Sequence, residues 1–262
     1  MTVDKTPANV TPFTVDVDEA KWKNPKHSGP PRTQSAVKDE EITRQVQKLL
    51  ELGVIRPSQA KYYSHPHLTP KPDGSWRFCI DYRALNNCSK SLGWPIPNID
   101  QLLRRIGAKK ANCFATFDLT SGYHQTAVDE STSEFTAFIC SSGLYEWVRT
   151  PFGLKGAPSY FMQKMATEVL NGLLYNTAEC YIDDVITWGK TPEELLANIE
   201  LLLKRFMDKN IKLHPKKAKI GMPQIEYTGH LLTLDGLLFS TQKIDKVINF
   251  KNPRTKKNYD HS

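Results

Sequence analysis

The sequence is poor in cysteine and has no long apolar run, and each lack excludes a class of protein. Its five cysteines are odd in number, widely scattered and without a CxxC pair. Neither a disulfide framework nor a zinc site is therefore predicted, and buried reduced thiols are expected. No run of about 18 apolar residues occurs, and the N-terminus lacks the charged-then-apolar pattern of a signal peptide. We expect an intracellular protein that does not enter a membrane.

Acidic residues are outnumbered by basic ones, which leaves a formal net charge of +7. This excess fits a polyanionic partner such as nucleic acid, although many surfaces carry similar charge for solubility alone. The 262 residues are 39% hydrophobic. They suffice for one large domain or two modest ones with a sizeable core.

The order of elements predicts the fold class. Residues 1–34 carry five prolines and little periodicity, which indicates an extended leader or linker. From residue 35 the pattern is helix, hairpin, helix, strand, hairpin, helix, strand-turn-strand, helix and hairpin, with Ser35 as the first N-cap and Asp235-Gly236 as the last turn. Thr191 to Glu194 reads as a capping box. We predict an α+β fold in which a mainly antiparallel sheet carries helices on one face.

Two consecutive acids, Asp183 and Asp184, interrupt a β-branched and aromatic run, as expected for two short strands that meet at a tight turn. A solvated hairpin tip would look the same. Asp118 ends another apolar strand, where a carboxylate is costly unless it is paired, hydrated or metal-bound. If the strands are neighbours, the three carboxylates converge. Such a cluster can hold two divalent ions for an in-line phosphoryl displacement, and Mg²⁺ suits its oxygen ligands.

Several polar and aromatic residues accompany the acids. Lys71 and Arg77 lie on opposite arms of a hairpin, where both could bind one triphosphate or simply face solvent. Tyr123 follows Asp118 closely and is either core or the wall of a site. The Gly- and Pro-rich loop at 151–158 allows close backbone approach to a ligand. The lysine-rich span at 204–219 is a solvated face or a track for a phosphate backbone.

These motifs, in this order, resemble the reverse-transcriptase domain of LTR retrotransposons of the gypsy type, with retroviral enzymes more distant. The matching segments are Gly53–Ser58, Lys71–Asn86, Phe117–Gln125, Pro151–Leu154 and Cys180–Trp188. The resemblance implies a right-hand polymerase. Its fingers would span about residues 35–112 and its palm 113–234, and a thumb would begin at 235–262. One departure is Met162 after Phe161, where the family usually has glutamine.

The resemblance also implies roles for single residues. Asp118, Asp183 and Asp184 would hold two Mg²⁺ ions, with Mn²⁺ as a substitute. Because neighbouring side chains diverge, we expect Asp183 to bridge the ions with Asp118, and Asp184 to be peripheral. Lys71 and Arg77 would bind the triphosphate of the incoming dNTP.

The remaining implied roles concern the sugar, the template and the primer. Tyr123 would be an aromatic gate that excludes a 2′-hydroxyl, and Phe152 and Gly153 would line the nucleotide pocket. The segment Tyr227, Thr228, Gly229 and His230 would hold the primer end. An RNA or DNA template with its primer would be bound mainly through the backbone.

The implied function is an RNA-directed DNA polymerase from a retrotransposon polyprotein, in a cytoplasmic virus-like particle or the nucleus. Two alternatives stay open: an inactive nucleic-acid-binding remnant, and an RNA-dependent RNA polymerase that shares the palm chemistry. The sequence stops where a thumb would be forming and shows no RNase H, integrase or protease segment. We therefore expect a fragment of a polyprotein or a truncated copy.

Overall fold

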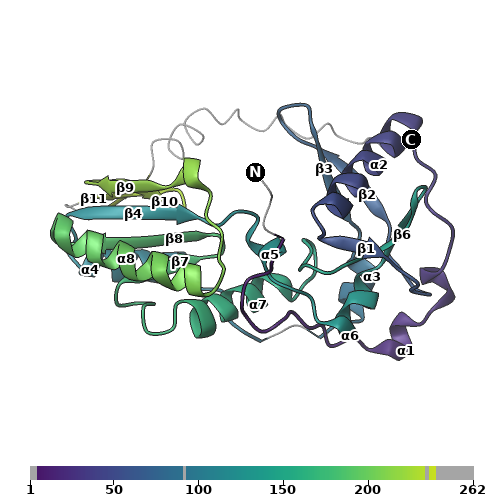
Figure 1. The fold of residues 1–262 in the computed structure, drawn as a ribbon, viewed down its shortest axis with the longest axis horizontal. Coiled ribbons are helices and arrows are strands. Elements are labelled where there is room, and N and C mark those ends of the chain that lie inside the picture. The colour runs from purple at the N-terminus through teal and green to yellow at the C-terminus, as the bar shows by residue number, and fades with distance from the viewer. Residues whose placement is uncertain (1–4, 91–92, 234–235, 240–262) are drawn as a thin grey trace, which may run out of the picture.

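The two strands that bear the acids lie side by side at the centre of the largest sheet (Figure 1). The computed structural model describes residues 5–90, 93–233 and 236–239. The sheet is antiparallel in the order β7-β8-β4-β9. Its strands are β7 (Ala178–Tyr181), β8 (Asp184–Gly189), β4 (Cys113–Asp118) and β9 (Lys219–Met222).

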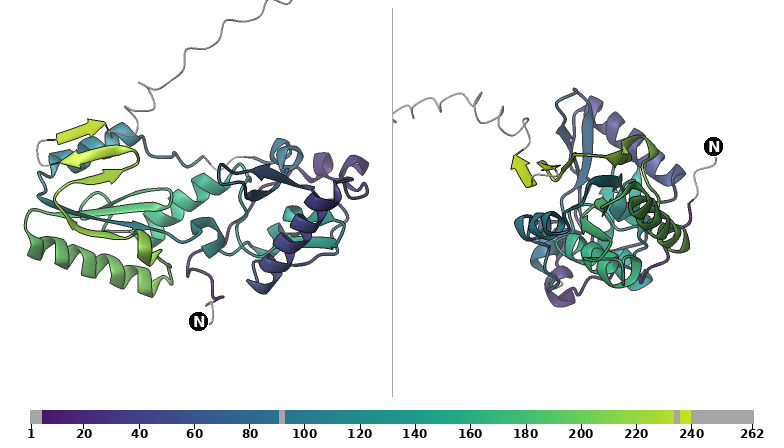
Figure 2. Two further views of the ribbon diagram at one scale, coloured as in Figure 1. Left: turned by 90° about the horizontal axis from the view of Figure 1, so that it is seen from above. Right: turned by 90° about the vertical axis from the view of Figure 1, so that its left-hand side faces the viewer.

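Strands β4 and β8 bury both of their faces. Phe117 and Val185 pack in one core with α7 (Ala157–Lys164) and α8 (Pro192–Asp208). Phe114 and Ile186 pack in another core with α4 (Ile99–Ala108) and a small sheet of β10 (Ile225–Tyr227), β11 (His230–Thr233) and β12 (Gly236–Phe239). Figure 2 shows α8 and the small sheet on opposite sides of the strands.

The predicted α+β fold with an antiparallel sheet is confirmed, but helices cover both faces of the sheet instead of one. The reason lies in β8, where Val185, Ile186, Thr187 and Trp188 are all buried. A strand that is apolar at successive positions needs cover on both sides. Helix α4 supplies the second cover.

A second lobe contains shorter sheets (Figure 1). One has the order β1-β6-β5, formed by β1 (Ile55–Pro57), β6 (Gly143–Trp147) and β5 (Phe138–Cys140), and the other is the hairpin of β2 (Pro66–Pro70) and β3 (Trp76–Ile80). Helices α2 (Ala36–Glu51), α3 (Arg83–Asn87) and α6 (Glu130–Ser133) complete this lobe.

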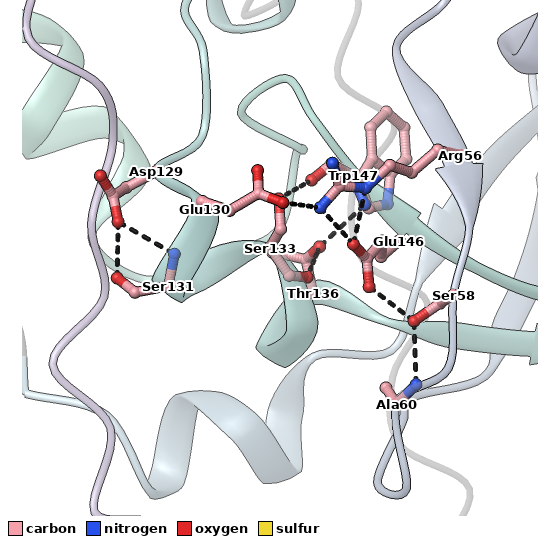
Figure 3. A network of polar contacts seen from close by, with 10 residues as sticks. All are labelled: Arg56, Ser58, Ala60, Asp129, Glu130, Ser131, Ser133, Thr136, Glu146 and Trp147. Carbon is pink, nitrogen blue, oxygen red and sulfur yellow. Dashed lines mark hydrogen bonds and ion pairs between the residues drawn. The ribbon is translucent and has the colours of Figure 1, made fainter.

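A polar network ties β1, β6 and α6 together (Figure 3). The Arg56 guanidinium pairs with Glu146, at 2.8 Å from Nε to Oε1, and with Glu130. Ser58 Oγ donates to the other Glu146 oxygen at 2.6 Å. Because Glu146 is buried, its charge needs these donors to offset lost hydration. The network thus joins β1 to β6 and to α6.

The helix ends follow the predicted signals with small shifts. Helix α2 starts after Ser35 as predicted, but the Ser35 hydroxyl does not cap it. Thr191 Oγ1 accepts from the Glu194 N–H at 3.2 Å, whereas the Glu194 carboxylate accepts from Lys190 N–H instead of Thr191. The helix predicted between the second hairpin and the strand-turn-strand is α7 followed by a π-helical turn, Met165–Val169.

Residues 5–34 are mostly extended and lie against both lobes, with the short helices α1 (Glu19–Trp22) and η1 (Pro25–His27) (purple in Figure 1). Phe13 and Trp22 are buried anchors, at 1% and 2% exposure. No helix in the described part of the chain is long and apolar enough to cross a membrane. The predicted thumb start falls almost entirely outside the described residues, as does Asp235 of the last predicted turn.

Candidate active site

Asp183 lies in the two-residue turn between β7 and β8, and Asp184 is the first residue of β8. Tyr181 and Asp184 are register partners, so the predicted tight turn is confirmed. Ile182 adopts a φ of +54°, in the left-handed region that β-branched residues rarely occupy. This backbone conformation allows the two acids to project differently from one turn.

Asp118 is the register partner of Asp184. Side chains of paired residues project to the same face of a sheet, so these two carboxylates face the side that carries Tyr227. The backbone oxygen of Asp183 accepts from the Leu119 N–H at 2.8 Å, which ties the turn to the end of β4. The structure therefore brings the three predicted acids together at one end of the sheet.

The electrostatics of the cluster reflect three crowded negative charges. Burial and then the charges of Asp118 and Asp184 raise the pKa of Asp183 to about 6. Burial and the charge of Asp118 also raise the pKa of Asp184. In addition, Asp183 Oδ1 is buried and has no hydrogen-bond partner among the described residues. A bound cation would relieve both the repulsion and the unpaired oxygen.

The donor chemistry of this cluster fits a divalent cation, because carboxylate oxygens on separate strands are the ligands that Mg²⁺ prefers. Within residues 5–90, 93–233 and 236–239, however, no three His, Cys, Asp or Glu side chains are already arranged as a cage. A protein cation lies beside the cluster: Lys217 Nζ is 3.0 Å from Asp118 Oδ2. Lys217 thus neutralises part of the cluster.

Tyr123 forms an aromatic wall beside the acids. It lies on α5 (Gly122–Gln125) and is 8% exposed. The centroid of its ring is 5.2 Å from that of Phe152 and 5.3 Å from that of Phe161. Burial and the nearby charge of Asp183 raise the pKa of Tyr123 to about 12. Phe152 is 52% exposed, so its ring, on the outer side of this wall, is accessible to a ligand.

Gly153 follows Phe152 in a conformation that favours glycine, with φ at +94°. The side chain of Asn86 holds this loop: its Nδ2 donates to Gly153 O at 2.8 Å, and its Oδ1 accepts from Lys155 N–H at 2.8 Å. Asn86 was part of a matching motif, but it was not among the predicted site residues. Its role depends on contact across about 70 residues of sequence, which no local pattern reveals.

The hairpin predicted to hold the primer contacts the strand end that bears Asp184 directly. The Tyr227 hydroxyl donates to the backbone oxygen of Asp184 at 3.0 Å, and its ring is buried. Thr228 and Gly229 form the hairpin turn, both with positive φ, and Tyr227 pairs with His230. A movement of this hairpin would therefore reach Asp184.

The family model for reverse transcriptase (RNA-dependent DNA polymerase) matches residues 69–232 of this chain. The chain belongs to the reverse transcriptase family. The match spans Lys71, all three acids and Tyr227. The predicted family is confirmed.

Relatives of this reverse transcriptase domain include retrotransposon proteins of Drosophila melanogaster. The Pol polyprotein from transposon 412 is 36% identical over 220 residues, and that from transposon gypsy is 32% identical over 218. The matches cover 82% and 81% of this chain but 18% and 21% of the relatives. The chain thus spans about a fifth of these polyproteins.

Solved structures show the same fold. A foamy viral protease-reverse transcriptase in complex with an RNA/DNA hybrid superimposes with a TM-score of 0.77 at 22% identity, over 95% of this chain and 32% of that one. A second structure of that protein, in complex with dsDNA, gives 0.77 at 21% identity, over 97% and 52%. The predicted fingers and palm architecture of a reverse transcriptase is therefore confirmed.

The predicted triphosphate residues of this reverse transcriptase lie on the hairpin of β2 and β3. Thr69 and Arg77 are register partners, and Lys71 N–H donates to Ser75 O at 2.8 Å, so the two cations are on opposite arms of one hairpin as predicted. No hydrogen bond or ion pair joins either of them to the acids in the part of the chain that the structure describes. Their role stays a prediction.

Lys217 is a further residue of this site that the sequence did not single out. It was one of several lysines in a basic span. Its contact arises because the segment before β9 runs beside the end of β4, where His214 N–H donates to Asp118 O at 2.8 Å. A lysine-rich run carries no signal that distinguishes the one member that meets a carboxylate.

Proposed function

We propose that this chain is the RNA-directed DNA polymerase domain of a retrotransposon polyprotein, which adds dNTPs to a primer 3′-hydroxyl. The observation that carries the proposal is the convergence of Asp118, Asp183 and Asp184 at the end of the palm sheet, between the Tyr123 wall and the Tyr227 hairpin. The family and fold support it. RNase H and integrase domains would accompany it in the full polyprotein.

Asp118, Asp183 and Asp184 would hold two Mg²⁺ ions, or Mn²⁺ in their place. Bound ions would favour ionisation of the primer hydroxyl and stabilise the leaving pyrophosphate. Lys217 pairs with one of these carboxylates, Asp118, so a bound ion would compete with Lys217 for Asp118 or share it. The protein's own contribution is mainly positioning and charge stabilisation.

The other residues would orient the substrates. Tyr123 and the open ring of Phe152 would pack against the sugar and base of the incoming nucleotide, beside Gly153. The hairpin of Lys71 and Arg77 would neutralise its triphosphate. The segment Tyr227 to His230 would position the primer end through the contact of Tyr227 with Asp184.

A primer-extension assay tests the function. The wild-type chain, with an RNA template, a DNA primer, dNTPs and Mg²⁺, should extend the primer. Asp183→Asn should lose on the order of 100-fold or more of that rate. Asp184→Asn should lose less, because Asp184 is expected at the periphery. Duplex binding, measured in parallel by fluorescence anisotropy, should persist in both variants.

The outcomes separate the candidate functions. Tight duplex binding by the wild type without extension would favour the inactive remnant. Extension with ribonucleotides as efficient as with dNTPs would favour an RNA polymerase. If Tyr123 is the gate, Tyr123→Ala should raise incorporation of ribonucleotides relative to dNTPs, and an unchanged ratio would refute that assignment.

A further inference from the structure

The turn that presents Asp183 is held by sulfur atoms. The Ile182 N–H points to Met162 Sδ at 3.0 Å, and Cys180 Sγ points to Ile182 O at 3.4 Å. A thioether is only a weak hydrogen-bond acceptor, and a thiol only a weak donor. The N–H and C=O groups of Ile182 therefore form weaker hydrogen bonds than most buried peptide groups, whose partners are oxygen and nitrogen atoms.

Ile182 is also the residue of this turn with a strained backbone. Its φ of +54° is uncommon for a non-glycine residue, and its β-branched side chain makes the conformation less favourable. Such a conformation persists only when surrounding contacts enforce it. The Met162 contact is one of these, and it acts one residue before Asp183.

Met162 is well placed to transmit position to the active site. It lies on α7 and is 2% exposed, so its side chain is confined by the core. The preceding residue, Phe161, packs edge to face against Tyr123. Helix α7 therefore supports the aromatic wall with one residue and the catalytic turn with the next.

We propose that Met162 is a positioning residue for the catalytic turn: its thioether sulfur holds the Ile182 amide and so sets where the Asp183 carboxylate projects. The proposal rests on the polymerase function proposed above. The backbone bond from Leu119 N–H to Asp183 O fixes the other end of the turn at 2.8 Å. The weaker sulfur contact at Ile182 then limits how firmly the carboxylate is oriented.

Three substitutions distinguish this role from simple packing. Met162→Leu keeps the volume but removes the acceptor, whereas Met162→Gln keeps the length and supplies a stronger acceptor in its amide oxygen. Met165→Leu is the matched control, because Met165 is as buried, lies in the π-helical turn that continues α7, and makes no hydrogen bond to the turn of Ile182 and Asp183 in the described residues. Packing alone predicts that glutamine is worse than leucine, since it buries an amide.

The proposal predicts the reverse order in primer extension. Met162→Leu should lower kcat about fivefold with the KM for dNTP nearly unchanged, because a hydrogen bond of modest strength is lost without loss of substrate contacts. Met162→Gln should match or exceed the wild type, and Met165→Leu should match it. A kcat for the leucine variant equal to or above that of the glutamine variant would overturn the proposal.

Hydrogen exchange of the Ile182 amide gives a readout that needs no activity. We would measure it by NMR on the metal-free full chain labelled with ¹⁵N-isoleucine. Exchange should be about fivefold faster in Met162→Leu than in the wild type, and as slow or slower in Met162→Gln. Equal rates in the wild type and Met162→Leu would disprove the inference. An inactive wild type with the predicted exchange order would instead contradict only the polymerase function.

Discussion

At the scale of single residues, Gly122 shows how tightly the active site is packed. A Cβ at this position would clash with Asp183 Oδ1 and would lie 3.1 Å from the Phe161 ring. Phe161 is buried and has no room to retreat, whereas Asp183 Oδ1 is the end of a side chain and can turn away. The absence of a side chain at residue 122 therefore sets the position of Asp183.

We predict that Gly122→Ala displaces Asp183 and lowers primer extension on the order of 100-fold, with about 1–3 kcal/mol lost from the free energy of unfolding. Gly107→Ala is the control, because its Cβ would meet nothing within 4 Å and alanine favours the α4 helix. Extension rates and chemical denaturation would measure both effects. A Gly122→Ala variant as active as the control would contradict the packing argument.

His124 predicts how stability depends on pH. It stacks on Trp147 with centroids 5.1 Å apart, and Phe152 packs edge-on at 4.9 Å. Burial lowers the pKa of His124 below its ordinary value near 6.5. Below that pH the unfolded chain binds a proton that the folded chain resists, so stability should fall as pH decreases through this range.

The measurement is the difference in unfolding free energy between the wild type and His124→Gln, from pH 7.5 to pH 5. The difference removes contributions shared by both chains, including that of Asp183. It should shift in favour of the variant as pH falls. A flat difference for His124→Gln would mean that the imidazole is protonated as easily in the folded state.

The sequence predicts site residues well when their type conflicts with their surroundings. Asp118, Asp183 and Asp184 are carboxylates at the ends of apolar strands, and the structure places them together. Lys217, Met162 and Gly122 carry no such conflict, since lysine in a basic run, methionine in a helix and glycine near a turn are ordinary. Their roles depend on contacts that form only after the chain has folded.

At the scale of elements, the extended leader is tied to the rest of the domain. Ala8 N–H donates to Gln125 O, and Asp18 N–H donates to Cys88 O, both at 2.7 Å. The prolines correctly indicated little regular structure. They could not indicate docking, because Phe13 and Trp22 are isolated apolar residues whose partners are distant in sequence.

Phe13 tests the contribution of this leader. Its ring is 1% exposed and packs edge to face on Tyr160, with centroids 4.9 Å apart. Phe13→Ala should lower the free energy of unfolding by about 3–5 kcal/mol, as expected when a large ring is removed from a core. Leu196→Ala, at a 66% exposed position on α8, should change it by less than about 0.5 kcal/mol. A loss of unfolding free energy in Phe13→Ala as small as that in Leu196→Ala would mean that the leader is not part of the folded core.

At the scale of the whole molecule, the two faces of the palm sheet are covered differently. A cavity of about 410 Å³ opens on the face of Asp118 and Asp184, and Lys216, Lys217 and Lys219 also line it. Helix α8 covers the opposite face. The net charge of +7 predicted a polyanion partner but could not show where it binds. The fold places part of that excess positive charge at the rim of the cavity beside Asp118 and Asp184.

Lys219 lies at this rim, and Lys204 lies on the exposed side of α8. If template-primer binds across the cavity, Lys219→Gln should weaken duplex binding at every sequence and reduce the slope of log affinity against log salt by about one, because one phosphate contact no longer releases a counterion. Lys204→Gln removes the same charge from the opposite face and should leave the slope unchanged. Equal changes in the two slopes, measured by anisotropy between 50 and 300 mM salt (roughly the range in which such contacts dominate), would show that net charge alone drives binding.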